Sequence, residues 1–295
     1  MSTSELPRIL GHRGARFVAP ENTVASFRAA IAEGADGVEL DLRRTLDHAL
    51  VCLHDPGLGR TTDGRGPVRQ RMLEEVRCLD ASAGLPWTAS LRSPAREAGG
   101  RKFGRNGSTG LPWTASPGSP ARSAGGRPFR GIQVPTLAEA LDALPPTALV
   151  DVEVKFRGEG PDGPADVAER LAAALSARPD RDRIMVSSFS RRLVAATAPR
   201  LPGMRVGPVT SALTPLGRAL RVAEAAGCTL LAAQAHAYLS PMAKAAASRA
   251  ADAGILLLAW TVDDPETARR LADLGVAVIV SDRPGQLRRA LAPPP

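Results

Sequence analysis

The stretch Gly37-Val38-Glu39-Leu40-Asp41-Leu42 places two acidic side chains at alternate positions of an apolar, strand-like run. In a β-strand, residues two apart point to the same face, so the carboxylates of Glu39 and Asp41 project together. Neighbouring carboxylates repel each other, and at least one becomes hard to ionise unless a cation compensates. If this strand lies in a parallel sheet, its acidic face needs a partner, and we expect a functional site at its end.

Strand-like and helix-like segments alternate along the chain on both sides of this stretch. The expected strands are 8–12, 37–42, 49–54, 148–155, 184–188, 205–209, 229–233, 255–262 and 276–281. The expected helices include 23–33, 137–144, 165–177, 191–198, 215–226, 241–253 and 265–274. Glycines stand where several of these helices should end, which supports the division: Gly34, Gly227, Gly254 and Gly275.

The alternation predicts parallel strands covered by outer helices. Without a long insert, roughly 250 residues remain, which is the size of a typical (β/α)8 TIM barrel. Nine expected strands are one more than the barrel needs, and only six residues separate Leu42 from Ala49, too few for a crossover helix. An open doubly wound sheet is the alternative. We favour the barrel because polar residues follow strands spread along the whole chain, as a barrel mouth requires.

The insert, residues 84–131, is an internal duplication. Gly84-Leu-Pro-Trp-Thr-Ala-Ser recurs from Gly110, and 16 of 20 positions match between 84–103 and 110–129. It holds eight Arg or Lys and one Glu, so most of the net charge of +8 lies there. Its Gly, Pro, Ser and Arg content predicts a long, disordered surface loop after the third strand of a single domain spanning 1–295. We favour a tolerated loop expansion over a functional module, because doubling a loop costs only about 0.6 kcal/mol.

Composition narrows the class of protein. A chain of 295 residues with 44% hydrophobic content suits a globular domain. No apolar run approaches the roughly 20 residues of a membrane span, and residues 1–10 lack the regions of a signal peptide. The three cysteines, Cys52, Cys78 and Cys228, are too few and too scattered for a disulfide framework. These features together predict a cytoplasmic protein.

Glu153 ends a later expected strand and offers a third carboxylate beside Glu39 and Asp41. Three carboxylates without a cluster of Cys or His favour a hard ion, Mg²⁺ or Ca²⁺, over zinc. The alternative is that these acids are ordinary strand residues paired with basic neighbours, namely Arg43, Arg44 and Lys155. The alternation of acids with apolar residues in 37–42 favours the metal site.

Two histidines, His12 and His54, each end an expected strand within a charged motif. Because the unperturbed imidazole pKa is about 6.5, one histidine could act as base and the other as acid on a bound phosphate. Arg13 offers a bidentate phosphate donor, and Lys155 offers a point charge. The other two histidines, His48 and His236, are interpreted as ordinary polar residues.

In combination, these motifs resemble the glycerophosphodiester phosphodiesterase family. The resemblance runs from Gly11 to about Leu291, interrupted by the insert. It rests on six motifs in order, which begin at His12, Pro20, Glu39, His54, Glu153 and Trp260. They are His-Arg-Gly, Pro-Glu-Asn-Thr, Glu-Leu-Asp, His-Asp followed by Arg60-Thr61-Thr62-Asp63-Gly64, Glu-Val-Lys and Trp-Thr-Val-Asp. Each motif alone is weak, whereas the combination and its order are specific.

The resemblance implies a TIM barrel and a role for each site residue. It assigns the divalent ion to Glu39, Asp41 and Glu153, proton transfer to His12 and His54, phosphate binding to Arg13 and Lys155, and the apolar pocket wall to Phe189 and Trp260. It also implies that Glu21 and Asn22 help to hold the loop after the first strand.

The activity that the resemblance implies is hydrolysis of small glycerophosphodiesters to glycerol 3-phosphate and an alcohol. Water and a neighbouring hydroxyl of the substrate are both open as the nucleophile. One alternative is a lysophospholipase-D-like enzyme acting on membrane lipids, with weak membrane contact through the basic insert. A further alternative is a non-catalytic protein that binds a partner such as nucleic acid through that insert. The complete set of expected site residues argues against it, and a nucleic-acid partner is not expected.

Overall fold

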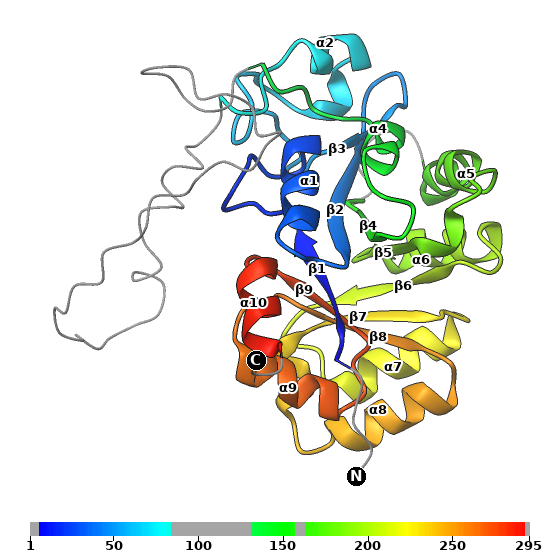
Figure 1. The fold of residues 1–295 in the computed structure, drawn as a ribbon. Coiled ribbons are helices and arrows are strands. Elements are labelled where there is room, and N and C mark those ends of the chain that lie inside the picture. The colour runs from blue at the N-terminus through cyan, green and yellow to red at the C-terminus, as the bar shows by residue number, and fades with distance from the viewer. Residues whose placement is uncertain (1–5, 84–130, 157–162, 293–295) are drawn as a thin grey trace, which may run out of the picture.

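The chain folds into a closed barrel of strands ringed by helices (Figure 1). The computed structural model describes residues 6–83, 131–156 and 163–292, so the insert expected at 84–131 lies outside the described residues, apart from Gly131. The strands are β1 (Arg8–His12), β2 (Gly37–Arg44), β3 (Leu50–Cys52), β4 (Leu149–Val154), β5 (Ile184–Ser188), β6 (Arg205–Thr210), β7 (Leu230–Gln234), β8 (Leu256–Trp260) and β9 (Val278–Ser281). All except β3 run parallel, and β1 pairs with both β2 and β9, which closes the barrel.

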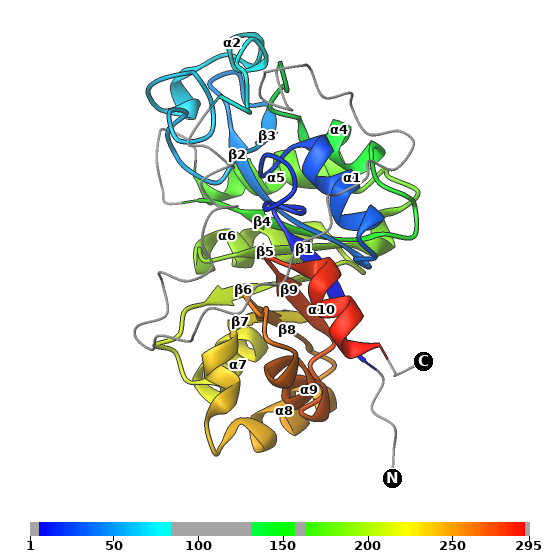
Figure 2. The same ribbon diagram turned by 60° about the vertical axis from the view of Figure 1, so that its left-hand side comes forward.

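Helices follow the strands and cover the outside of the barrel, as Figures 1 and 2 show from two directions. They are α1 (Val24–Ala32), α2 (Leu73–Arg77), α4 (Leu137–Asp142), α5 (Pro164–Leu175), α6 (Arg191–Thr197), α7 (Leu216–Ala225), α8 (Ala243–Asp252), α9 (Pro265–Asp273) and α10 (Pro284–Leu291). Short 3-10 turns are η1 (Val68–Gln70), η2 (Arg181–Arg183), η3 (Ala198–Arg200) and η4 (Ala235–Leu239). Within the described residues, no helix is both long enough and apolar enough to cross a membrane.

The barrel prediction is confirmed, and the extra strand has a simple explanation. The short connection after β2 turns back, so that β3 pairs antiparallel with the end of β2, from Leu42 opposite Cys52 to Arg44 opposite Leu50. This strand extends the sheet beyond the barrel and needs no crossover helix. It ends at Cys52, so His54 lies in the following loop and does not end the strand as predicted. Helices α2 and α10 were not predicted, although Pro284 at the first position of α10 is a start signal.

Alternation along the strands separates two apolar cores. Val38 and Leu40 of β2 belong to the larger core, which the strands form with the outer helices. A second cluster fills the barrel interior and consists of Leu10, Met185, Val209, Leu230, Ala232, Leu258, Val278 and Val280. Because side chains alternate between the two faces of a strand, Glu39 and Asp41 point to the interior side. Strand β2 therefore directs Glu39 and Asp41 into the barrel, on the side where the apolar cluster lies.

The buried side chain of Arg183 joins η2 to helix α4 and to the residue before β4. Arg183 in η2 is 7% exposed and donates to the carbonyl oxygens of Leu141 and Ala148, each at 2.9 Å. It also donates to Asp180 Oδ2 from Nη2 at 2.7 Å. We expect Arg183→Met to lower the free energy of unfolding by about 3 kcal/mol, because it leaves Asp180 and two carbonyl oxygens without this donor.

Urea unfolding followed by circular dichroism measures this effect. The matched control is Arg181→Met, two residues away, whose partly exposed side chain forms, among the described residues, an ion pair only with Asp182, at 4.0 Å. The control should change the unfolding free energy by less than about 0.5 kcal/mol. Equal losses in the two variants would contradict the assigned role of Arg183.

Candidate active site

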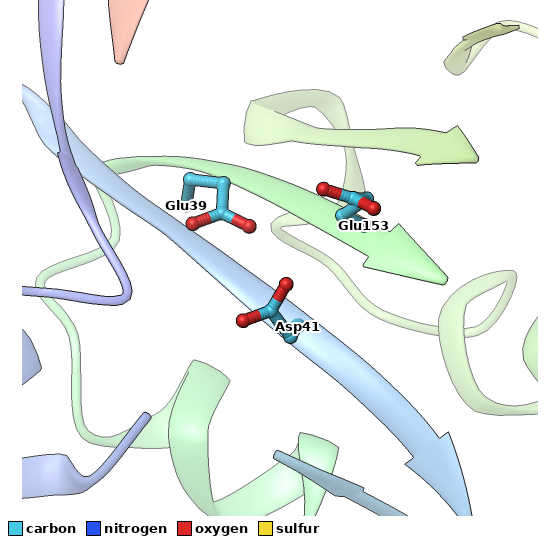
Figure 3. Close-up of side chains that lie close together, drawn as sticks. All are labelled: Glu39, Asp41 and Glu153. Atoms are coloured by element: carbon cyan, nitrogen blue, oxygen red, sulfur yellow. The ribbon is translucent and has the colours of Figure 1, made fainter. Parts of the chain in front are cut away.

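Three carboxylates, called here the acidic triad, meet inside the barrel on the neighbouring strands β2 and β4. Glu39 and Asp41 come from β2 and Glu153 from β4, where Asp41 stands in register with Glu153. One oxygen of each residue lies within 4.8 Å of the others. Figure 3 shows Glu39 and Asp41 along β2 and Glu153 close to them on the adjacent strand β4. The parallel register therefore joins residues that are far apart in the sequence.

The acidic triad fits a bound cation. Glu39 and Asp41 are 3% and 0% exposed, and Glu39 Oε1 has no hydrogen-bond partner among the described residues. Burial raises the pKa of Glu39 well above its usual range, and the charges of Asp41 and Glu153 raise it further. Burial also raises the pKa of Glu153. A divalent cation would relieve this repulsion, and a set of carboxylate oxygens suits Mg²⁺ or Ca²⁺.

Two basic side chains form ion pairs with the triad and offset part of its negative charge. Lys155 Nζ lies 2.9 Å from Asp41 Oδ1 and also contacts Glu153 Oε1. Arg13 Nε lies 3.1 Å from Asp41 Oδ2. Burial would raise the pKa of Asp41, but the charges of Arg13 and Lys155 outweigh it and hold that pKa below its ordinary value. Pairing of the acids with Lys155, which the sequence offered as an alternative to a metal site, thus coexists with the triad.

The loop after β1 is fastened directly to the triad. Asn22 Nδ2 donates to Asp41 Oδ2 at 2.8 Å, and the Asp41 backbone N–H donates to Asn22 Oδ1 at 3.0 Å. The Arg13 backbone N–H donates to Glu39 Oε2 at 2.9 Å. Arg13 and Asn22 both have positive φ, 57° and 56°, which residues other than glycine rarely adopt. These bonds hold the strained backbone in place, and Asn22 lies where the resemblance implied that it would hold the loop.

The far end of the same loop is fixed by α1. Thr23 caps this helix by accepting a hydrogen bond from the Ser26 backbone N–H, in a capping box. Gly14 has a φ of 77°, and a Cβ at this position would lie 2.5 Å from the Ser26 backbone. Glycine is therefore required there. The motifs that begin at His12 and at Pro20 together encode one rigid loop that presents Arg13 to the triad.

Both predicted catalytic histidines are paired with a carboxylate through Nδ1. His12 Nδ1 lies 2.6 Å from Asp282 Oδ1, and His54 Nδ1 lies 2.6 Å from Asp55 Oδ1. An acidic partner on Nδ1 fixes the tautomer and leaves Nε2 as the atom that exchanges protons. His12 Nε2 lies 3.9 Å from Glu39 Oε2, so this histidine stands beside the triad.

The loop position of His54 has its own support. The Arg43 side chain on β2 donates from Nε to the His54 carbonyl oxygen at 2.7 Å. Burial lowers the pKa of His54, although the charge of Asp41 opposes this shift. The lowered pKa favours the neutral imidazole near neutral pH, which is the form that a general base needs.

A network of charges surrounds His54, and two of its members, Asp55 and Arg60, had no role predicted from the sequence. Arg60 donates to Asp55 Oδ2 at 2.6 Å and to Glu21 Oε1 at 2.6 Å. Glu21 in turn accepts from Arg13 Nη1 at 2.9 Å, which links both sides of the site. Burial would raise the pKa of Asp55, but hydrogen bonds from Arg60 and His54 outweigh it and lower that pKa to about 2. Asp55 is therefore ionised at any pH near neutrality.

Asp282 is a further residue whose role was not predicted from the sequence. It follows β9 and accepts from Arg16 Nη1 at 3.4 Å in addition to its contact with His12. Its backbone N–H donates to Asp263 Oδ1 at 2.8 Å. The available signal was its place after the last strand, because the last and first strands of a closed barrel are neighbours.

The two predicted aromatic residues line one side of the mouth. Phe189 follows β5 and packs edge-on against Trp260 at the end of β8, with ring centroids 5.7 Å apart. Lys155 Nζ lies 5.8 Å from the centre of the Phe189 ring, so the aromatic pair adjoins the triad. Trp260 Nε1 and Gln234 Oε1 are buried without a hydrogen-bond partner in the part of the chain that the structure describes. Gln234 stands in register with Trp260 on the adjacent strand β7.

Comparison with known proteins gives one consistent family. The profile of the Glycerophosphoryl diester phosphodiesterase family matches residues 12–286. A protein of Mycobacterium tuberculosis described as "Probable glycerophosphodiester phosphodiesterase 1" is 30% identical over 296 aligned positions, covering 96% of this chain and 91% of the relative. The "Glycerophosphodiester phosphodiesterase" of Caldanaerobacter subterraneus is 28% identical over 282, covering 95% of each chain.

Solved structures with the same fold support the architecture. A phosphodiesterase from Oleispira antarctica, in complex with the product sn-glycerol-3-phosphate, superposes with a TM-score of 0.71 at 24% identity and covers 97% of both chains. A protein from Silicibacter pomeroyi, described as a putative glycerophosphoryl diester phosphodiesterase, gives a TM-score of 0.73 at 24% identity, covering 97% of this chain and 93% of that one. At this identity the likeness establishes the fold.

Proposed function

Because the chain belongs to the glycerophosphoryl diester phosphodiesterase family, and is thus a phosphoric diester hydrolase, we propose that it releases sn-glycerol 3-phosphate and an alcohol with a divalent ion on the acidic triad. The observation that carries the proposal is the pair of histidine–carboxylate contacts beside a buried triad. The product bound to the Oleispira relative supports the choice of glycerol phosphate.

The proposed mechanism uses one imidazole as a general base and the other as a general acid. Mg²⁺ or Ca²⁺ bound to Glu39, Asp41 and Glu153 would neutralise phosphate charge and lower the pKa of a hydroxyl. His54 takes the proton of the attacking hydroxyl, because its lowered pKa favours the neutral form. His12 gives a proton to the oxygen of the leaving alcohol. Asp55 and Asp282 hold the two rings by their Nδ1 atoms and stabilise the charged form of each ring.

Substrate binding divides between charged and uncharged groups. Arg13 and Lys155 supply positive charge for the phosphate oxygens, where negative charge grows in the transition state. Phe189 and Trp260 form the apolar wall against the carbon skeleton. Trp260 Nε1 and Gln234 Oε1 supply a donor and an acceptor for a glycerol hydroxyl, since both atoms are buried without a partner among the described residues.

The proposal extends to cell compartment and domain organisation. A cytoplasmic location fits the free thiols of Cys52, Cys78 and Cys228, of which Cys78 is exposed. We also propose that the chain acts as one domain, because the described residues before and after the insert complete the same barrel.

Hydrolysis of glycerophosphocholine in the presence of Mg²⁺, Ca²⁺ or EDTA tests the proposed function. We expect release of glycerol 3-phosphate with at least one of the two ions and none with EDTA, and restoration when the ion is added back. Turnover that persists in EDTA would contradict the metal site. Release of phosphocholine instead of glycerol 3-phosphate would contradict the proposed position of bond cleavage.

Asp282→Asn tests the positioning role of the carboxylate on His12. The amide still fits, but it does not hold the imidazolium that forms after proton uptake, so we expect kcat to fall by about a hundredfold or more. KM should change little, because Asp282 does not touch the phosphate in the proposal. The control is Asp264→Asn, an exposed cap of α9 that should leave kcat unchanged. A rise in KM with an unchanged kcat would contradict the assignment.

A further inference from the structure

The chain between Asp182 and Asp252 is strongly basic. This segment holds nine Arg or Lys and a single acid, Glu224. Glu224 is paired with Arg249, whose Nη2 lies 2.6 Å from Glu224 Oε2. The segment contains β5 to β7, α6, α7 and all of α8 except its last residue, Asp252. These residues are all described, so the excess charge of the segment is distinct from that of the insert.

Four of these basic residues gather along one arc of the barrel mouth. Arg191 and Arg192 open α6, Arg218 lies in the first turn of α7, and Lys244 lies in the first turn of α8. Strands β5, β6 and β7 are neighbours in the barrel, so the loops that lead into these helices are neighbours too. In both Figure 1 and Figure 2, α6, α7 and α8 follow one another around the barrel.

These basic residues are not explained by the stability of the fold. All four are exposed, and none makes a hydrogen bond or ion pair with another described residue. Positive charge in the first turn of a helix opposes the helix dipole, which favours acids there. The first turns of α6, α7 and α8 contain no acid. Three consecutive helices thus carry positive charge in the first turn, where the helix dipole disfavours it, on the same side of the molecule.

The same loops expose large apolar side chains. Leu213 in the loop after β6 is 93% exposed and Met242 after β7 is 72% exposed, the two highest values among the described large hydrophobic residues. Leu239, also after β7, is half exposed, and Phe189 after β5 adjoins the triad. Burying such side chains is favourable, and these residues lie in the adjoining loops after β5, β6 and β7, so they indicate an interaction surface there.

We propose that the loops after β5, β6 and β7 form a surface, called here the basic–apolar rim, that binds anionic lipid bilayers. Exposed Leu and Met among unpaired Arg and Lys match both regions of a bilayer surface, because the apolar groups enter the acyl boundary and the basic groups face the anionic head groups. Nucleic acid would match the charge but would leave Leu213 and Met242 in water. The rim ends at the loop after β8, where Asp264 and Glu266 are exposed.

The rim has a consequence for substrate choice that rests on the proposed function. Phe189 belongs both to the rim and to the wall of the proposed active site. A bilayer bound at the rim therefore lies against the mouth of the barrel. In this position the enzyme would reach glycerophosphodiesters that carry an acyl chain, such as lysophosphatidylglycerol, without taking them fully into water.

Vesicle flotation with the full chain tests the proposal. The test variant is Arg191→Gln/Arg218→Gln/Lys244→Gln, and the control is Arg200→Gln/Arg270→Gln/Arg289→Gln, which removes the same charge from exposed residues at the other ends of helices. On vesicles of equimolar phosphatidylglycerol and phosphatidylcholine, we expect the test variant to bind roughly a hundredfold more weakly than wild type, about fivefold for each basic residue. The control should bind like wild type.

A second variant, Leu213→Ser/Met242→Ser, separates the apolar contribution from the charge. It should weaken vesicle binding about tenfold or more while leaving the salt dependence of binding intact. Binding by both test variants at the wild-type level would overturn the proposal and would assign vesicle binding to another basic segment. Wild-type binding to nucleic acid, lost in the test variant, without binding to vesicles would overturn it as well.

Two further readouts keep this proposal separate from the proposed function. Neither variant changes a residue placed in the active site, so both should hydrolyse soluble glycerophosphocholine with wild-type kcat/KM. Hydrolysis of lysophosphatidylglycerol in vesicles should fall together with binding. If wild type binds vesicles through the rim but hydrolyses neither substrate, the proposed function fails and the lipid surface stands.

Discussion

His12→Ala is expected to lower kcat for glycerophosphocholine by about a thousandfold, within the range of about 10²–10⁴ usual for loss of a positioned acid or base. The imidazole is held by Asp282 on Nδ1, and its Nε2 lies 3.9 Å from Glu39 of the triad. In the proposed mechanism, alanine removes the proton donor but leaves the proposed phosphate-binding groups, Arg13 and Lys155, in place. Steady-state kinetics should therefore show a large fall in kcat with little change in KM.

Two comparisons sharpen this expectation. His54→Ala should cause a fall of similar size. The double variant should lose little more than either single variant, because in the proposed mechanism the base and the acid act together in one reaction step. His236→Ala is the matched control, since His236 is exposed in η4 and has no assigned role. Kinetics of His12→Ala within about threefold of the control would exclude His12 from proton transfer.

The sequence predicted the barrel well because its signals are local and repeated. Apolar runs, helix caps and terminal glycines recur with each unit, and the glycines at the expected ends of helices, Gly34, Gly227, Gly254 and Gly275, all have positive φ. The antiparallel course of β3 was less predictable, because its partner is chosen by a short turn and not by its own composition. Helix α2 was not predicted, because its five residues are too few to show a periodic pattern.

The acidic triad was predictable for a different reason. Glu39 and Asp41 share a strand face by simple alternation, and the register of β2 with β4 then brings in Glu153. The carboxylate on His12 lacked such a local signal, whereas Asp55 directly follows His54 in the sequence. Asp282 reaches His12 only because the barrel closes between β9 and β1, so its role depends on tertiary structure. Arg60 likewise reaches Glu21 through a loop contact that no sequence spacing describes.

Glu39→Gln is expected to make the metal-free protein more stable while it disables the enzyme. Burial raises the pKa of Glu39 well above its usual range, with the charges of Asp41 and Glu153 adding to the effect. The native state therefore binds more protons than the unfolded chain above the unfolded pKa of about 4.3, and stability falls as pH rises through the window up to the raised native pKa. The neutral amide removes this loss and still accepts from the Arg13 N–H.

Thermal unfolding at neutral pH with EDTA should show a gain of about 1–2 kcal/mol for Glu39→Gln over wild type. Excess Mg²⁺ or Ca²⁺ should reverse the order, because wild type gains about 2.7 kcal/mol when the ion exceeds its Kd a hundredfold, whereas the variant has lost one ligand. Hydrolysis by the variant should fall at least about a hundredfold.

The control for this reversal is Asp151→Asn, which replaces a buried acid on the neighbouring strand β4. Asp151 lies in register with Glu39, burial raises its pKa to about 7, and its Oδ2 accepts from Ser187 at 3.2 Å. Because Asp151 is outside the acidic triad, its variant should keep the stabilisation by metal even where it raises the stability without metal. If added metal stabilises Glu39→Gln as much as wild type, the ion does not bind to Glu39. If neither protein responds to metal, the repulsion among the three carboxylates is balanced by Arg13 and Lys155 alone.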